Sequence, residues 1–63
     1  MKTIPIAIVD DHTLISKALE NMISENPQYR VIMNHPNGED FIAGIEKASE
    51  LPDVVLMDVN MPY

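Results

Sequence analysis

Residues 51–62 read Leu51-Pro-Asp-Val-Val-Leu-Met-Asp-Val-Asn-Met-Pro62, a short apolar run that stops at a carboxylate and is followed by loop residues. The four residues Val54 to Met57 are apolar without alternation, which predicts a strand covered on both faces, as in a parallel sheet with helices above and below. Pro52 and Pro62 bound this element. Taken alone, the run also fits a core strand with an ordinary polar exit residue, so a function for Asp58 requires a second acidic strand end.

The chain contains such a second strand end near its start. Ile4 to Val9 is an apolar run of strand length, and the pair Asp10-Asp11 closes it. Pro5 is tolerated near the beginning of a strand. We therefore expect a first strand here, with its carboxyl end marked by two acids.

Two segments carry apolar residues at helical spacing. We expect one helix over Leu14–Asn26, with Asp11 or Thr13 as its N-cap, and a second helix over about Glu39–Ser49, with Asn37 as its N-cap. The apolar stripes are formed by Leu14, Ile15, Ala18, Leu19, Met22 and Ile23 in the first helix and by Phe41, Ile42, Ile45 and Ala48 in the second.

Between the two helical segments, Tyr29 to Asn34 alternates, with Tyr29, Val31 and Met33 on one side of the predicted strand. This pattern is typical of a half-exposed edge strand. The order strand, helix, strand, helix, strand has short connections, which favours parallel pairing through right-handed crossovers. We expect an α/β fold with the spatial strand order 2-1-3, which places the first and third strands side by side.

The carboxyl ends of these two neighbouring strands would bring Asp10, Asp11 and Asp58 to one rim of the sheet, where open α/β sheets bind ligands. Clustered carboxylates repel one another, and a divalent cation removes the conflict. Oxygen ligands favour Mg²⁺, which leaves room for a phosphate oxygen. A carboxylate beside the ion can attack phosphorus to form an aspartyl phosphate, although this chemistry alone does not identify the nucleophile.

The segment Ile8-Val-Asp-Asp-His12, followed by a helix and then by Asp53-Val-Val-Leu-Met-Asp-Val-Asn-Met-Pro62, resembles the receiver domain of bacterial two-component response regulators. The resemblance implies that Asp58 is the phosphoacceptor. It also implies that Mg²⁺ is held by Asp10, acting mainly through metal-bound water, by Asp11 and Asp58 directly, and by the backbone carbonyl of Asn60. A sensor histidine kinase would be the phosphoryl donor, and the domain itself would not be an enzyme.

The resemblance further implies a flavodoxin-like, doubly wound parallel sheet, of which residues 1–63 would form the N-terminal half, without a second domain. The family's fourth and fifth strands carry a Ser or Thr and a Lys that contact the phosphoryl group. Without them we expect impaired phosphorylation and impaired output. The opening Asp-Asp-His-Thr-Leu-Ile is most similar to receivers joined to helix-turn-helix DNA-binding output domains.

Two alternatives belong to other functional classes. A haloacid-dehalogenase-like phosphatase also uses a strand-end Asp with Mg²⁺, but it places a second Asp two residues after the nucleophile. Here His12 stands two residues after Asp10, and Asn60 stands two residues after Asp58. The other alternative is an idle truncation product that acts only as a self-associating structural fragment.

The charge and composition of the chain exclude some kinds of binding partner and location. The 63 residues carry ten acids against four bases, a net charge of −6, which argues against direct contact with nucleic acid because that contact needs clustered Lys and Arg. No apolar stretch is long enough to cross a membrane. The absence of cysteine is compatible with a reducing compartment, and we expect a cytoplasmic protein.

Two further expectations concern single elements. In a three-stranded sheet with one helix on each face, the third strand would lie at an open edge, and its residues Val54, Val55, Leu56 and Met57 would favour a homodimer or larger assembly. His12 follows two acids and precedes a helix. We expect it to serve in the loop or as a cap more readily than as a metal ligand.

Overall fold

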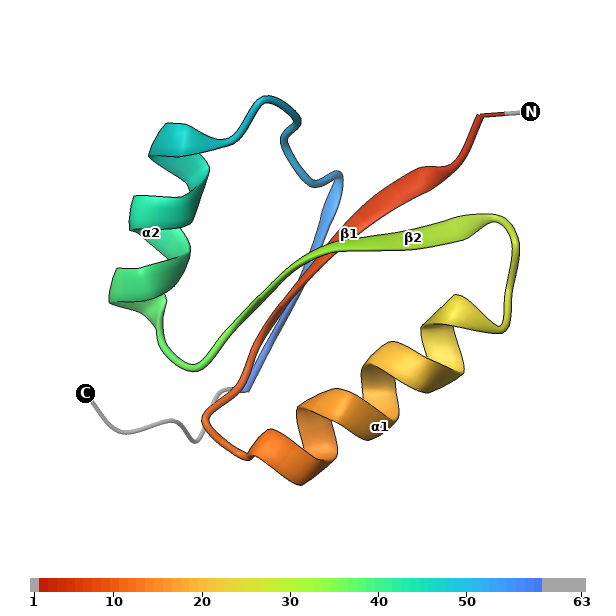
Figure 1. The fold of residues 1–63 in the computed structure, drawn as a ribbon, viewed down its shortest axis with the longest axis horizontal. Helices are drawn as coiled ribbons and strands as arrows, with labels where there is room; N and C mark the ends of the chain where they lie inside the picture. The colour runs from red at the N-terminus through yellow and green to blue at the C-terminus, as the bar shows by residue number, and fades with distance from the viewer. Residues whose placement is uncertain (1, 59–63) are drawn as a thin grey trace.

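The computed structural model describes residues 2–58, and the ribbon in Figure 1 follows the chain through five elements. These elements are β1 (Ile4–Val9), α1 (Thr13–Ser24), β2 (Tyr29–His35), α2 (Gly38–Lys47) and β3 (Val54–Met57). The strands form one parallel sheet in the order β2-β1-β3. The helices lie on opposite faces of this sheet (Figure 1). The predicted α/β fold with the strand order 2-1-3 is therefore confirmed.

The core of the described chain is concentrated in the central strand. Ile6, Ala7, Ile8 and Val9 of β1 are all at most 5% exposed. β1 is paired on both edges and lies between the two helices, so its side chains lose water on every side. This strand provides the fixed frame from which the acidic residues emerge.

β3 differs from the prediction that its apolar run is covered on both faces. Each of its four residues, Val54 to Met57, is between 39% and 52% exposed. α1 packs against β2 and β1, α2 packs against β2, and among residues 2–58 β3 pairs with β1 alone. The alternative expectation, that β3 lies at an open edge, is confirmed.

α1 also buries a different surface from the one predicted. Leu14 is 86% exposed and Met22 is 67% exposed, whereas Ser16 is buried. The helix packs against β2 and β1. Apolar side chains of α1 that do not face these two strands therefore stay exposed to solvent among the described residues. The helix ends at Ser24, two residues before the predicted end, with Glu25 as its C-cap, and the Asn26 backbone N–H donates to the Ile23 carbonyl in a tighter turn.

Of the residues expected as possible caps, Asn37 and His12 lie at the N-cap positions of the two helices, whereas Asp11 and Thr13 do not. Asn37 caps α2 as expected, since its side-chain oxygen accepts a hydrogen bond from the Asp40 backbone N–H at 2.8 Å. The N-cap position of α1 belongs to His12, without a capping side-chain bond, in place of Asp11 or Thr13. The reason is that His12 itself accepts the first helical bond, from the Ser16 backbone N–H.

β2 is an edge strand as predicted, but its alternation is interrupted by a bulge. Ile6 pairs with Val31 and the next residue, Ala7, pairs with Met33, so Ile32 is an extra residue in β2. Val31 and Met33 consequently point to opposite faces, contrary to the predicted pattern. After the bulge, the Asn34 amide donates to Glu20 of α1 at 2.9 Å.

On the other face, the side chain of His35 packs against α2. A Cβ atom placed on Gly44 would lie 2.7 Å from His35 Nε2, so the absence of a side chain at Gly44 lets helix and strand approach closely. The His35 ring also lies at a tilt to that of Phe41, with centroids 6.4 Å apart. This packing holds α2 against the carboxyl end of β2.

Candidate metal and phosphoacceptor site

The site lies where β1 and β3 end side by side. Val9 and Met57 are the last paired residues of the two strands, and the Asp58 backbone N–H donates to the Val9 carbonyl at 3.1 Å. The Asp10 backbone N–H donates to the His35 carbonyl of β2, also at 3.1 Å. Backbone bonds therefore bring the two acids to the same rim of the sheet, as the sequence predicted.

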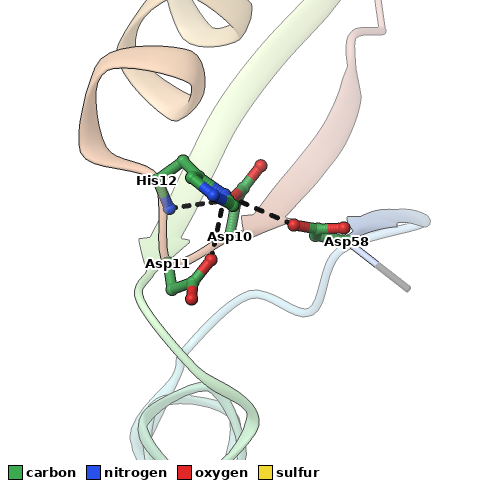
Figure 2. A group of neighbouring side chains, drawn as sticks. All are labelled: Asp10, Asp11, His12 and Asp58. Carbon is green, nitrogen blue, oxygen red and sulfur yellow. Dashed lines mark hydrogen bonds and ion pairs between the residues drawn. The ribbon is translucent and has the colours of Figure 1, made fainter. Parts of the chain in front are cut away.

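Four side chains converge at this rim, as Figure 2 shows. One ligand atom from each of Asp10, Asp11, His12 and Asp58 lies within 4.8 Å of all the others. The three acids are unequally exposed, with 10% of the Asp10 side chain, 38% of the Asp11 side chain and 19% of the Asp58 side chain accessible. The predicted gathering of three carboxylates is thus present, and a cation can reach it from solvent.

His12 lies among the carboxylates, which the sequence reasoning missed. Its Nδ1 is 3.0 Å from Asp10 Oδ1, 3.0 Å from Asp11 Oδ1 and 3.4 Å from Asp58 Oδ2 (Figure 2). Its backbone N–H also donates to Asp10 Oδ1 at 2.8 Å. His12 does occupy the predicted cap position, but its ring turns back toward the acids. The sequence does contain a signal for this position, because His12 directly follows Asp10 and Asp11 in the short segment between β1 and α1.

These contacts change the pKa values of two groups in the cluster. Hydrogen bonding from the His12 backbone N–H is the main cause that lowers the pKa of Asp10 below its ordinary value of 3.8. The side-chain hydrogen bond with Asp10, followed by the charge of Asp11, raises the pKa of His12 above its ordinary value of 6.5. Both shifts favour the charged pair of carboxylate and imidazolium.

The donor set fits a divalent cation. Three carboxylates that face one position offer hard oxygen ligands, which suit Mg²⁺, and the imidazole ring lies where a positive charge is attracted. The carbonyl of Asn60, predicted as a further ligand, lies outside the described residues.

A hollow of about 380 Å³ opens beside the cluster. Asp10, His12 and Asp58 form its polar end, and apolar side chains from β1, α1 and β3, such as Ile8, Ile15 and Leu56, form the remainder. No Lys or Arg lines this hollow among the described residues. A small anionic group could therefore approach Asp58, with positive charge coming from a bound cation or from His12.

Comparison with known proteins identifies related sequences. A family model described as the response regulator receiver domain matches residues 6–63. Over 94% of this chain, the sequence is 37% identical to the transcriptional regulatory protein DegU of Brevibacillus brevis. It is 40% identical over 90% of the chain to the nitrate/nitrite response regulator protein NarL of Escherichia coli. It is also 48% identical over 95% of the chain to a protein-glutamate methylesterase/protein-glutamine glutaminase of Methanosarcina barkeri.

The matches cover only a small part of these relatives. The chain spans 24% of DegU, 26% of NarL and 16% of the methylesterase. The shared region is therefore found in proteins whose names describe different activities. Among residues 2–58, no helix is long and apolar enough to cross a membrane.

Proposed function

The chain belongs to the response regulator receiver domain family, and from this premise we propose that Asp58 accepts a phosphoryl group from a sensor histidine kinase. The observation that carries the proposal is the convergence of Asp10, Asp11 and Asp58 at the ends of two paired strands. Asp58 is the proposed acceptor because it follows β3 and faces the open hollow.

In the proposed reaction, a carboxylate oxygen of Asp58 attacks phosphorus and the bond between phosphorus and the donor's imidazole nitrogen breaks. The electron pair of that bond leaves with the imidazole. Asp11, the most exposed of the three acids, is proposed as a direct Mg²⁺ ligand together with Asp58 and the Asn60 carbonyl. Asp10, which is 10% exposed and bonded to the His12 backbone, is proposed to act mainly through metal-bound water. When bound, Mg²⁺ would supply positive charge to the transferring phosphoryl group.

Residues 1–63 by themselves are proposed to accept phosphate slowly. The hollow beside Asp58 is lined by no Lys or Arg among the described residues, so one source of charge stabilisation for the transferring group is weak. The names of the longer relatives describe transcriptional regulation in one case and a methylesterase in another, and we propose that such output involves sequence outside the shared region. We therefore propose a regulatory phosphoacceptor, without catalytic turnover of its own.

Intact-mass measurement after incubation with a small-molecule phosphodonor tests this function. We expect the addition of one phosphoryl group in the presence of Mg²⁺, and none after Mg²⁺ is removed with a chelator. Asp58→Asn should abolish the addition. Asp53→Asn, which changes the exposed acid at the other end of β3, is the matched control and should retain it. Undiminished labelling of the Asp58→Asn protein would contradict the assignment.

We also propose that the chain self-associates through β3. This strand is exposed at all four positions, and among residues 2–58 its outer edge pairs with no other strand. An exposed apolar strand edge can pair with the same edge of a second copy.

Light scattering over a range of protein concentrations tests the association. We expect a concentration-dependent dimer or larger assembly, and we expect Val55→Lys to shift it toward the monomer because a charge on an edge strand opposes pairing. Leu14→Lys is the control, since it adds the same charge at an exposed apolar position on α1. A folded monomer at every concentration would refute the proposal.

A further inference from the structure

The cluster contains a nitrogen atom in a place where oxygen ligands were expected. His12 Nδ1 lies 3.0 Å from one oxygen of Asp10, 3.0 Å from one oxygen of Asp11 and 3.4 Å from one oxygen of Asp58. The three acids come from two different strand ends, so the ring is directed toward their common centre and not toward a single partner (Figure 2).

These separations match those between neighbouring ligands of one metal ion. In an octahedral site with bonds of about 2.1 Å, adjacent ligand atoms lie about 3.0 Å apart and opposite ligands lie about 4.2 Å apart. The three distances from Nδ1 are close to the first value, and the 4.8 Å span of all four ligand atoms is slightly larger than the second. A small contraction would place all four atoms around one cation.

We propose that His12 is a further ligand of this site, through Nδ1, and that it makes the site bind first-row transition ions more tightly than Mg²⁺. The inference rests on the proposed metal site at Asp10, Asp11 and Asp58. Imidazole nitrogen is a good ligand for ions such as Ni²⁺, Cu²⁺ and Zn²⁺, whereas Mg²⁺ prefers oxygen. One nitrogen among three carboxylates therefore favours transition ions over Mg²⁺, and the affinity of the site should rise from Mn²⁺ to Cu²⁺.

The position of His12 in the fold supports this role. Its backbone is held at the start of α1, where it donates to Asp10 Oδ1 and accepts from the Ser16 N–H. Its side chain is 58% exposed, so a binding cation can displace the Nδ1 proton to water while the other ring nitrogen remains hydrogen-bonded to solvent. The backbone thus fixes the ring near the cation position without burying it.

Calorimetric titration of the tag-free chain with Ni²⁺ and, separately, with Mg²⁺ tests the inference. We expect the chain to bind Ni²⁺ more tightly than Mg²⁺, and His12→Ala to weaken Ni²⁺ binding by at least about tenfold while changing Mg²⁺ binding far less. His35→Ala is the matched control, because His35 is the other of the two histidines and packs against α2. It should leave both affinities unchanged. Circular dichroism of each variant verifies the fold.

A spectroscopic measurement identifies the ligand directly. With Cu²⁺ bound, pulsed electron paramagnetic resonance should show the signal of a coordinated imidazole in the original chain and in His35→Ala, and should lose it in His12→Ala. Persistence of that signal in His12→Ala would overturn the inference.

The remaining outcomes separate the inference from the proposed function. An equal loss, or a gain, of affinity for both ions in His12→Ala would show that the ring only occupies the place of a cation, and would overturn the inference. Binding of neither ion would overturn it as well. Asp11→Asn should weaken the binding of both ions. If it changes neither affinity while His12→Ala removes Ni²⁺ binding, the role of Asp11 as a direct ligand in the proposed function fails, whereas His12 remains a ligand beside Asp10 and Asp58.

Discussion

β1 and β3 are neighbouring strands of similar composition with opposite environments. Both are short apolar runs that end at an aspartate, and they pair in register from Ile6 with Val54 to Val9 with Met57. The paired residues of β1 are nevertheless at most 5% exposed, whereas those of β3 are 39% to 52% exposed. The difference comes from the neighbours of each strand, because β1 has a strand on either side and β3 has one among the described residues.

The same difference extends to the two acids. Asp10 follows the central strand, and its backbone is bonded to β2, while its carboxylate accepts from the His12 backbone. Asp58 follows the edge strand and is bonded through its backbone to Val9. The geometry of the site is therefore set on the β1 side, and the position of Asp58 depends on how well β3 is held against β1.

The largest expected effect on stability comes from a substitution in the buried strand, β1. Ile8→Ala should lower the free energy of unfolding by about 2–5 kcal/mol, because it leaves a cavity in a fully buried position. A loss of this size can unfold a chain of this length. Urea unfolding followed by circular dichroism measures it. Ile8→Val serves as the control, with an expected loss of about 0.5–1.5 kcal/mol. A loss below that of Ile8→Val would contradict the assignment of the core.

Leu56, which pairs with Ile8, provides the smaller counterpart. Leu56→Ala should lower the free energy of unfolding by about 1 kcal/mol, because 39% of the residue is already in contact with water. The same urea experiment should be made at concentrations where light scattering finds monomers. A loss as large as that of Ile8→Ala would mean that β3 is covered in solution, and would remove the contrast between the two strands.

The smallest expected effect concerns the segment that leads into β3. Arg30 of β2 donates two hydrogen bonds of 2.7 Å to Glu50, and the Arg30 bond lowers the pKa of Glu50 below its ordinary value of 4.5. A lowered pKa in the folded state stabilises the fold above the pKa of the unfolded state. This stabilisation is lost as the pH falls through the folded-state value.

Urea midpoints at about pH 6 and about pH 3 measure this contribution. The midpoint should fall slightly less on acidification in Glu50→Gln than in the original chain, since the pair is exposed and screened by solvent. Glu46→Gln, which changes an exposed acid on α2, should behave like the original chain. An identical pH dependence of the Glu50→Gln and original proteins would show that the pair does not help to hold the approach to β3.

The sequence predicted the strands and their order well, because apolar runs of six and four residues that end at acids, with an alternating segment between them, leave few alternatives. Ile4–Val9 and Val54–Met57 have the predicted bounds. The gathering of Asp10, Asp11 and Asp58 followed from that order, since the carboxyl ends of adjacent parallel strands meet.

Three features were not predicted: the buried surface of α1, the place of the His12 ring and the bulge in β2. They depend on tertiary contacts and backbone turns, which the spacing of apolar residues does not reveal. The stripe on α1 predicted burial of Leu14 and Met22, but a helix buries only the surface that another element covers. The place of the His12 ring depended on a backbone turn of three residues, which brings Nδ1 back to the acids. A single extra residue in β2 likewise leaves no mark in the apolar pattern.

The extra residue Ile32 determines which helix each later side chain of β2 faces. Before the bulge, odd-numbered positions such as Val31 share a face with the even-numbered residues of β1, and after it Asn34 takes that face while His35 takes the other. Asn34 thereby reaches Glu20 of α1, and His35 reaches Gly44 of α2. If the same residues paired with β1 without the bulge, Ile32 would stand opposite Ala7, and Asn34 and His35 would each face the other helix. In this strand, the count of residues, more than their hydrophobicity, encodes which neighbour each one contacts.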